Sequence, residues 1–275
     1  MLKKLLKYDW KSVSLLLLIL HGILLVYTLI GRLGIAFGIS TSADTLAASV
    51  TTVYGIAAGL YILVYVLFIF AIVVATYVYL AVRFQKNLFS DEGYLTHTLP
   101  VSPTKLIWSK ILVAWAWIAI DLVCVVASFF LLLLFKETSG PIGELFQEFI
   151  DIFTGAYGTQ DQIFIILLIL SMIAQLFGFY TTLALFSMCL GSLFKTHKIL
   201  GAIVSFFGIN IVFSMISTIL MFVVPAWSPI TYETSGLTGS QQNGLFLCYL
   251  ILYLVCSVIF FLGSRYILTK KLNLE

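Results

Sequence analysis

Long uninterrupted apolar runs constrain this sequence more than any other feature. Leu15–Leu20 and Leu131–Leu134 contain apolar residues alone, and several apolar stretches exceed the roughly 18 residues that mark a membrane-spanning helix. A membrane-spanning strand would instead alternate apolar and polar residues over about ten positions. Charged residues make up only 10% of the chain, against about a quarter in a soluble domain. The sequence therefore predicts an all-α integral membrane protein.

Six stretches are expected to cross the membrane. Their approximate ranges are 12–31, 50–82, 105–135, 162–193, 198–224 and 244–266. The second stretch would be about 50 Å long at about 1.5 Å per residue. That length exceeds the roughly 30 Å hydrocarbon core, so we expect this helix to tilt or to project into the cytoplasm. We treat residues 1–275 as one six-span domain.

The basic residues predict the orientation of these spans. Of the 15 Lys and Arg residues, 13 fall on alternate connections, at 3–11, 83–110, 195–198 and 265–271. Only Arg32 and Lys136 fall elsewhere. Cytoplasmic loops of membrane proteins carry an excess of Lys and Arg. We therefore expect both termini and the loop at 83–104 to be cytoplasmic, and the connections at 136–161 and 225–243 to lie outside.

The segment 1–11 is expected to form an amphipathic helix on the membrane surface. Its lysines and its large apolar residues occupy different sides of a helix, which is typical of an interfacial helix. The apolar residues are Leu2, Leu5, Leu6 and Trp10, and the lysines are Lys3, Lys4, Lys7 and Lys11. The alternative interpretation is that this segment is simply the basic flank of the first span.

The outer connection 136–161 is also expected to contain a helix. Ser139-Gly140-Pro141 is a helix-start signal, because proline suits the first helical turn. The residues that follow place an apolar stripe opposite three acidic residues. We predict an amphipathic helix on the outer surface.

Sequence motifs for catalysis and for nucleotide binding are absent. The chain contains no G-x-x-x-x-G-K-[ST], H-E-x-x-H or G-x-S-x-G segment. The three histidines are scattered, and all four cysteines lie in apolar runs, so we expect no disulfide and no metal site. The basic residues lie at membrane edges, which argues against a nucleic-acid partner. We expect no enzyme activity and no cofactor bound by this chain.

Asp121 is a carboxylate near the middle of the third predicted span. Such a residue costs about 2.5–3.5 kcal/mol at the centre of a helix and needs a partner or a wet cavity. One interpretation is a group that lines a substrate or proton path; the other is a residue that joins helices through a hydrogen bond. No basic partner is visible in the sequence around it. His21, in the first span, is expected to make a helix–helix hydrogen bond.

The loop at 83–104, between spans two and three, is unusually defined. Ser90 suits an N-cap, acidic residues suit the first turn that follows, and Pro100 disfavours helix at the residue before it. About two turns of helix fit between these signals. A short helix held at the membrane by two long spans is suited to docking a partner, although an ordinary inner loop is the alternative. The candidate docking residues are Asp91, Glu92, Tyr94, Leu95, His97, Leu99 and Pro100.

Three segments together resemble permease subunits of ATP-binding-cassette (ABC) exporters of the ABC-2 type. They are Leu5–Lys11, the run from Asp91 to Ser102, and Ser109-Lys110. The order of a surface helix, six spans and an inner loop after span two is also similar. The short, polar connection at 225–243 departs from the family plan, in which this outer segment is a re-entrant helix.

The resemblance implies a function and a set of partners. The loop after span two would be a coupling helix that seats in a groove of a separate ATPase subunit, which would bind ATP and magnesium. A second permease chain, identical or related, would complete the path for cargo across a bacterial cytoplasmic membrane. Two alternatives remain open: a secondary transporter, or a membrane scaffold or sensor that transports nothing.

Overall fold

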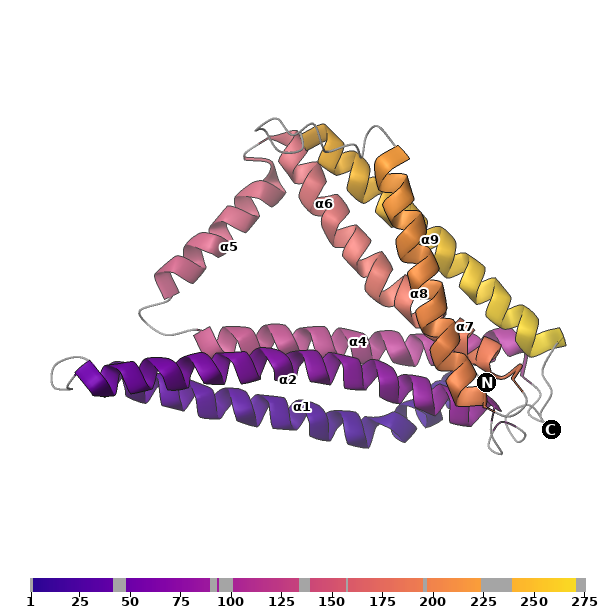
Figure 1. Cartoon of the computed structure of the whole chain (residues 1–275), viewed down its shortest axis with the longest axis horizontal. Helices are drawn as coiled ribbons and strands as arrows, with labels where there is room; N and C mark the ends of the chain where they lie inside the picture. Colours follow the sequence, from indigo (N-terminus) through magenta and orange to yellow (C-terminus); the bar gives the residue numbers. More distant parts are fainter. Residues whose placement is uncertain are drawn as a thin grey trace.

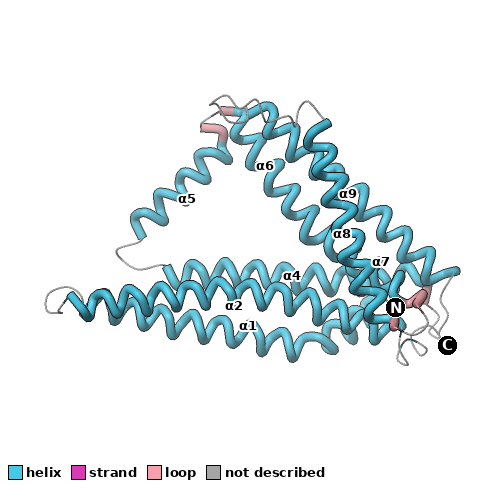
Figure 2. The backbone as a smooth tube through the Cα atoms, in the orientation of Figure 1, coloured by secondary structure: helices cyan, strands magenta, loops and turns pink. Residues whose placement is uncertain are grey.

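The fold was analysed in a computed structural model. It describes residues 2–41, 48–89, 93, 101–133, 139–156, 158–194, 197–223 and 239–270. Helices make up nearly all of this part of the chain (Figure 2). The elements are α1 (Leu2–Thr41), α2 (Ala48–Phe89), α4 (Pro103–Leu133), α5 (Ser139–Thr154), α6 (Thr159–Ile173), the π-helix η1 (Ala174–Tyr180), α7 (Thr181–Gly191), α8 (Lys198–Val223) and α9 (Gly239–Lys270).

Six helical stretches are long and apolar enough to cross a membrane. They are Lys3–Gly34, Gly55–Phe89, Pro103–Leu132, Thr159–Gly191, Lys198–Ile219 and Asn243–Lys270. Each overlaps one of the ranges predicted from the sequence, so the prediction of an all-helical chain with six helices of membrane-spanning length and apolarity is confirmed. The fourth stretch is continuous through α6, η1 and α7.

The helices form two groups that meet at one end. The first group contains α1, α2 and α4, and the second contains α6–η1–α7, α8 and α9. Figure 1 shows the two groups diverging from a common end, where α1 begins and α9 ends, while α5 links their far ends. We call the region where the groups meet the joint.

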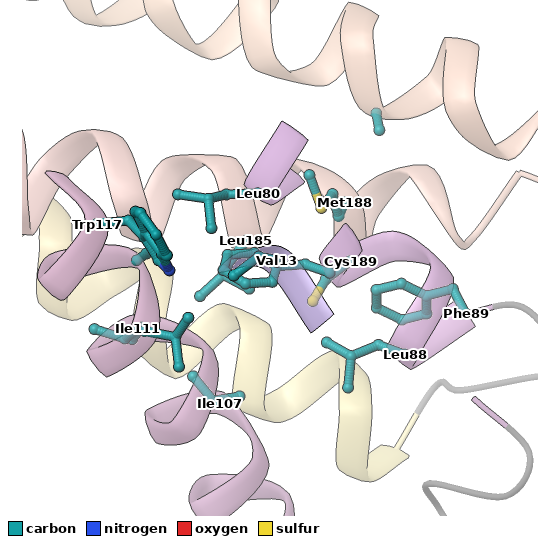
Figure 3. Packing of buried hydrophobic residues seen from close by; sticks show 14 of the residues in the cluster. Val13, Leu80, Leu88, Phe89, Ile107, Ile111, Trp117, Leu185, Met188 and Cys189 are labelled. Atoms are coloured by element: carbon teal, nitrogen blue, oxygen red, sulfur yellow. The ribbon is translucent and has the colours of Figure 1, made fainter. Parts of the chain in front are cut away.

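A buried apolar cluster holds the joint together. It includes residues from α1, α2, α4, α7, α8 and α9, and Figure 3 shows side chains from α1, α2, α4 and α7 converging. Lipid tails are as apolar as leucine, so helices in a membrane associate through close packing and polar contacts. The joint is therefore where the two groups hold each other. Its most buried members include Val13, Leu17, Leu88, Ile107, Ile111 and Trp117.

The segment 2–11 is the opening of α1. No break separates it from the first span, because α1 is one helix from Leu2 to Thr41. Val13 and Leu17 face inward in the continuing turns, while Trp10 stacks on Trp117 of α4 with ring centroids 4.8 Å apart. The first turns of α1 thus continue the packing of the span that follows.

Several predicted boundaries differ in the structure. The loop predicted at 83–104 is shorter, because α2 continues to Phe89 and α4 begins at Pro103. The helix predicted after Ser139-Gly140-Pro141 is present as α5. Part of the outer connection predicted at 225–243 belongs to α9, which begins at Gly239, and residues 225–238 lie outside the described residues.

Gly191 tests the packing at the joint. A methyl group at this position would lie 2.5 Å from the backbone nitrogen of Ala202 and 2.6 Å from the carbonyl oxygen of Lys198. Gly191→Ala should therefore push α7 from α8 and lower stability by about 1–3 kcal/mol, as overpacking of a tight core does. The readout is the thermal unfolding midpoint in detergent.

The matched control is Gly208→Ala, on α8. No atom lies within 4 Å of the added methyl group there, so this change should leave the midpoint unchanged or raise it slightly, because alanine favours helix. Equal effects of the two substitutions would contradict the close approach of α7 to α8.

Candidate functional site

A buried polar site joins the three helices of the first group. Nε2 of His21, on α1, lies 2.5 Å from Oδ1 of Asp121, on α4. The hydroxyl of Thr76, on α2, donates to the same carboxylate oxygen at 3.1 Å. All three residues are buried, with at most 4% of the surface of each exposed. We call these residues the His21–Asp121 site.

The structure supplies the partner that the sequence left open for Asp121. The sequence shows no basic residue near Asp121, because His21 lies 100 positions away and meets it only through the packing of α1 on α4. The sequence predicts that His21 makes a helix–helix hydrogen bond. It meets the carboxylate of Asp121 on another helix at ion-pair distance, but the geometry at Nε2 is not that of a hydrogen bond. Nδ1 of His21 lies 2.6 Å from the backbone carbonyl oxygen of Leu17, one turn earlier in α1.

Aromatic rings cover the site. The Trp117 ring lies one turn before Asp121 on the same face of α4, and its centroid is 6.2 Å from that of His21. Three buried atoms here have no hydrogen-bond partner of acceptable geometry in the described part of the chain: Nε2 of His21, Oδ2 of Asp121 and Nε1 of Trp117. Nε2 contacts Oδ1 of Asp121 at ion-pair distance, whereas Oδ2 and Nε1 contact no polar partner. The site therefore combines an acceptor and a donor that are both unused.

A second buried ion pair joins the first turns of the same two helices. Nζ of Lys110 donates to Oδ1 of Asp9, and the Ser109 hydroxyl donates to Oδ2 of Asp9 at 2.9 Å. Sequence reasoning missed this pair, because Lys110 was counted as a basic residue of the cytoplasmic loop. The signal that could have revealed it is Asp9 itself, the only acid among the lysines of segment 1–11.

Three polar contacts thus tie α1 to α4 along their length. The third is a hydrogen bond from Nη1 of Arg32 to the carbonyl oxygen of Leu131, at 2.7 Å. The tied positions follow one another at intervals of about three helical turns on both helices, so each tie returns to the same face. The pairs run in the same order along both helices, as expected for the parallel spans one and three of a helical membrane protein. The pairs are Asp9–Lys110, His21–Asp121 and Arg32–Leu131.

The π-helix η1 lies where the two groups touch. Its wider turn leaves carbonyl groups without their usual helical partners. Side chains of the first group take up two of them: the Tyr77 hydroxyl donates to the carbonyl oxygen of Leu176 at 3.2 Å, and Nε1 of Trp115 donates to that of Phe177. Sequence reasoning missed η1, because a π-turn has no periodic signal in an apolar run.

The predicted docking residues fall outside the described part of the chain. These residues are Asp91, Glu92, Tyr94, Leu95, His97, Leu99 and Pro100. Their flanks are described: Leu88 and Phe89 end α2, Ile107 and Ile111 lie in the first turns of α4, and all four belong to the buried cluster of the joint. The two ends of the loop are thus fixed in the joint.

No metal centre is found among the residues that the structure describes. No group of three or more His, Cys, Asp or Glu side chains could hold an ion there. The four cysteines are free. Comparisons with protein-family models, with curated proteins and with solved structures gave no match for this chain.

Two substitutions of Asp121 separate its charge from its place in the packing. Asp121→Asn keeps the shape and can donate its amide to His21, so the protein should remain close to wild type in stability. Asp121→Leu removes the partner of His21 and Thr76, and it should lower stability by about 1–3 kcal/mol, because buried polar groups are left without a partner. Unfolding midpoints in detergent give both values, and a Leu variant as stable as Asn would contradict the pairing.

Proposed function

We propose that this chain is the permease subunit of an ABC exporter in a bacterial cytoplasmic membrane. The proposal rests on the sequence resemblance and on one structural observation: the helix ends on both sides of the loop at 90–102 are anchored in the joint. Both flanks of this loop pack in the cluster that also contains residues of α7 and α9. A partner bound to the loop would therefore act on both helix groups at once.

In this proposal, the joint faces the cytoplasm and transmits movement. Leu88 and Ile107, from the two sides of the loop, share the cluster with Met188 of α7 and Ile267 of α9. Closure of an ATPase pair would push the loops and shift the two groups against each other, in a rigid-body change between inward-open and outward-open states. The packed joint would carry the movement, because packed interfaces switch between discrete arrangements and do not deform continuously.

The missing nucleotide motif fits a division of labour between subunits. This chain would form the cargo path with a second permease chain, while ATPase subunits bind ATP and magnesium and hydrolyse the nucleotide. The lysines that precede Asp9 would hold the start of α1 at the cytoplasmic membrane surface, where anionic lipids attract basic side chains.

A secondary transporter driven by an ion gradient is a second candidate. The observation that favours it is the His21–Asp121 site, because paired ionisable groups inside spans mark many ion pathways. The two candidate functions require different components for transport in reconstituted vesicles. An ABC permease needs its ATPase subunit and ATP on the cytoplasmic side, whereas a secondary transporter moves cargo with the permease chain and an ion gradient alone.

The docking loop provides the direct test of the proposal. The large apolar pair Tyr94 and Leu95 would anchor the ATPase, and truncation of such anchors typically costs about 2 kcal/mol or more in binding. Tyr94→Ala with Leu95→Ala should therefore weaken co-purification of the ATPase by roughly 30-fold in affinity and uncouple hydrolysis from export. The measurements are ATPase binding by the tagged permease and the ATPase rate in vesicles.

A matched control uses the apolar pair Leu145 and Phe146 on α5. These side chains are 66% and 57% exposed, and they lie on the connection that the proposal places outside the cell. Leu145→Ala with Phe146→Ala should leave ATPase binding unchanged. Full binding and full export by the Tyr94/Leu95 double variant would refute the coupling role of the loop.

A further inference from the structure

We propose that the His21–Asp121 site is a proton-binding site inside the membrane, in which the pair holds one proton, either on Nε2 of His21 or on Oδ1 of Asp121. The inference rests on the geometry of the pair and does not depend on the kind of transport. Its ligand is a single proton, and its effect is to join α1 to α4 at a point that three helices bury.

The hydrogen bond at the other ring nitrogen fixes where protons sit. Nδ1 of His21 is 2.6 Å from the carbonyl oxygen of Leu17. A carbonyl oxygen can only accept a hydrogen bond, so Nδ1 must carry a hydrogen. In a neutral imidazole, Nε2 would then be a bare acceptor.

A bare Nε2 is incompatible with its neighbour. Nε2 lies 2.5 Å from Oδ1 of Asp121, and an ionised carboxylate is also only an acceptor. Two lone pairs at this separation repel each other. A proton between the two atoms removes the repulsion, whether it resides on the nitrogen, as imidazolium and carboxylate, or on the oxygen, as imidazole and carboxylic acid.

The charge of the site leads to the same conclusion. Both placements of the proton leave the pair with no net charge, whereas its loss would leave one negative charge within the span. An uncompensated charge there is unfavourable by several kcal/mol. In the described part of the chain, Oδ2 of Asp121 has no hydrogen-bond partner and Oδ1 accepts a hydrogen bond only from the Thr76 hydroxyl, so the proton of the pair is what compensates the carboxylate.

Among the described residues, the groups around the carboxylate offer no other positive charge. From α2, Thr76 donates to the carboxylate, and Tyr77 of α2 and Cys124 of α4 are close enough to interact with it electrostatically. None of these three side chains can become a cation. From α1, His21 is the partner itself. The proton therefore remains the compensating ligand for Asp121.

The test counts the protons on the pair. Full-length protein carrying His97→Gln and His197→Gln has His21 as its only histidine, so a ¹⁵N-histidine label in lipid bilayers reports this ring alone. Infrared difference spectra between this protein and its Asp121→Asn derivative report whether the Asp121 carboxyl carries a proton. Both are recorded at about pH 8, where an exposed histidine with its ordinary pKa of about 6.5 is neutral.

Two results support the proposal. Either His21 carries hydrogens on both nitrogens while Asp121 is ionised, or His21 carries one hydrogen while Asp121 is a carboxylic acid. In the protein that retains Asp121, a His21 ring with one hydrogen beside an ionised Asp121 would overturn the proposal. In the Asp121→Asn derivative, His21 should carry a single hydrogen, on Nδ1; a doubly protonated ring there would also overturn the proposal.

The matched control keeps His197 as the only histidine, through His21→Gln and His97→Gln. His197 is exposed just before α8, so its signal shows how the label behaves in an exposed histidine of the same protein and bilayer. Free ¹⁵N-histidine measured at about pH 5 and at about pH 8, on either side of the ordinary pKa of about 6.5, gives the reference signals of the protonated and the neutral ring.

Discussion

The lack of water inside a bilayer is the constraint on which this structure depends. Any polar side chain within a span must find its partner on another helix or on its own backbone. Three such partnerships, Asp9–Lys110, His21–Asp121 and Arg32–Leu131, lie along the seam between α1 and α4. They select one register, because a shift by a single residue would turn each group away from its partner. The first helix group is therefore defined by polar contacts as much as by packing.

The register of α1 and α4 also determines what reaches the joint. It brings the start of α4 beside the start of α1, and the end of α2 then packs in the same cluster as α7 and α9. The second group is tied to this arrangement through η1, whose carbonyl groups bond to Tyr77 and Trp115. A loop that begins and ends in such a joint can influence both groups, whatever partner it binds.

The sequence predicted the structural features that depend on local patterns. It missed the contacts between residues that lie far apart in the sequence. Six spans and the helix after Pro141 follow from apolar runs and from capping chemistry, both of which are local. The partner of Asp121 could not be predicted, because His21 lies two spans away and only the packing of α1 on α4 brings them together. Lys110 was misjudged because its position at the end of a span suits both a loop and a buried pair. The π-helix depends on packing against Tyr77 and Trp115, and an apolar run in the sequence gives no sign of this packing.

The central claim is that the joint faces the cytoplasm, where a soluble partner can reach the loop. Single cysteines at four exposed positions test it directly. Lys86 lies in the last turn of α2 and Lys270 ends α9, whereas Glu144 lies on α5 and Asp161 in the first turn of α6. Figure 1 shows α5 and the start of α6 away from the joint. A membrane-impermeant thiol reagent applied to intact cells should label the variants at 144 and 161, and label those at 86 and 270 only after the membrane is opened. Labelling of 86 and 270 in intact cells, with 144 and 161 protected, would contradict the orientation and the coupling role of the loop.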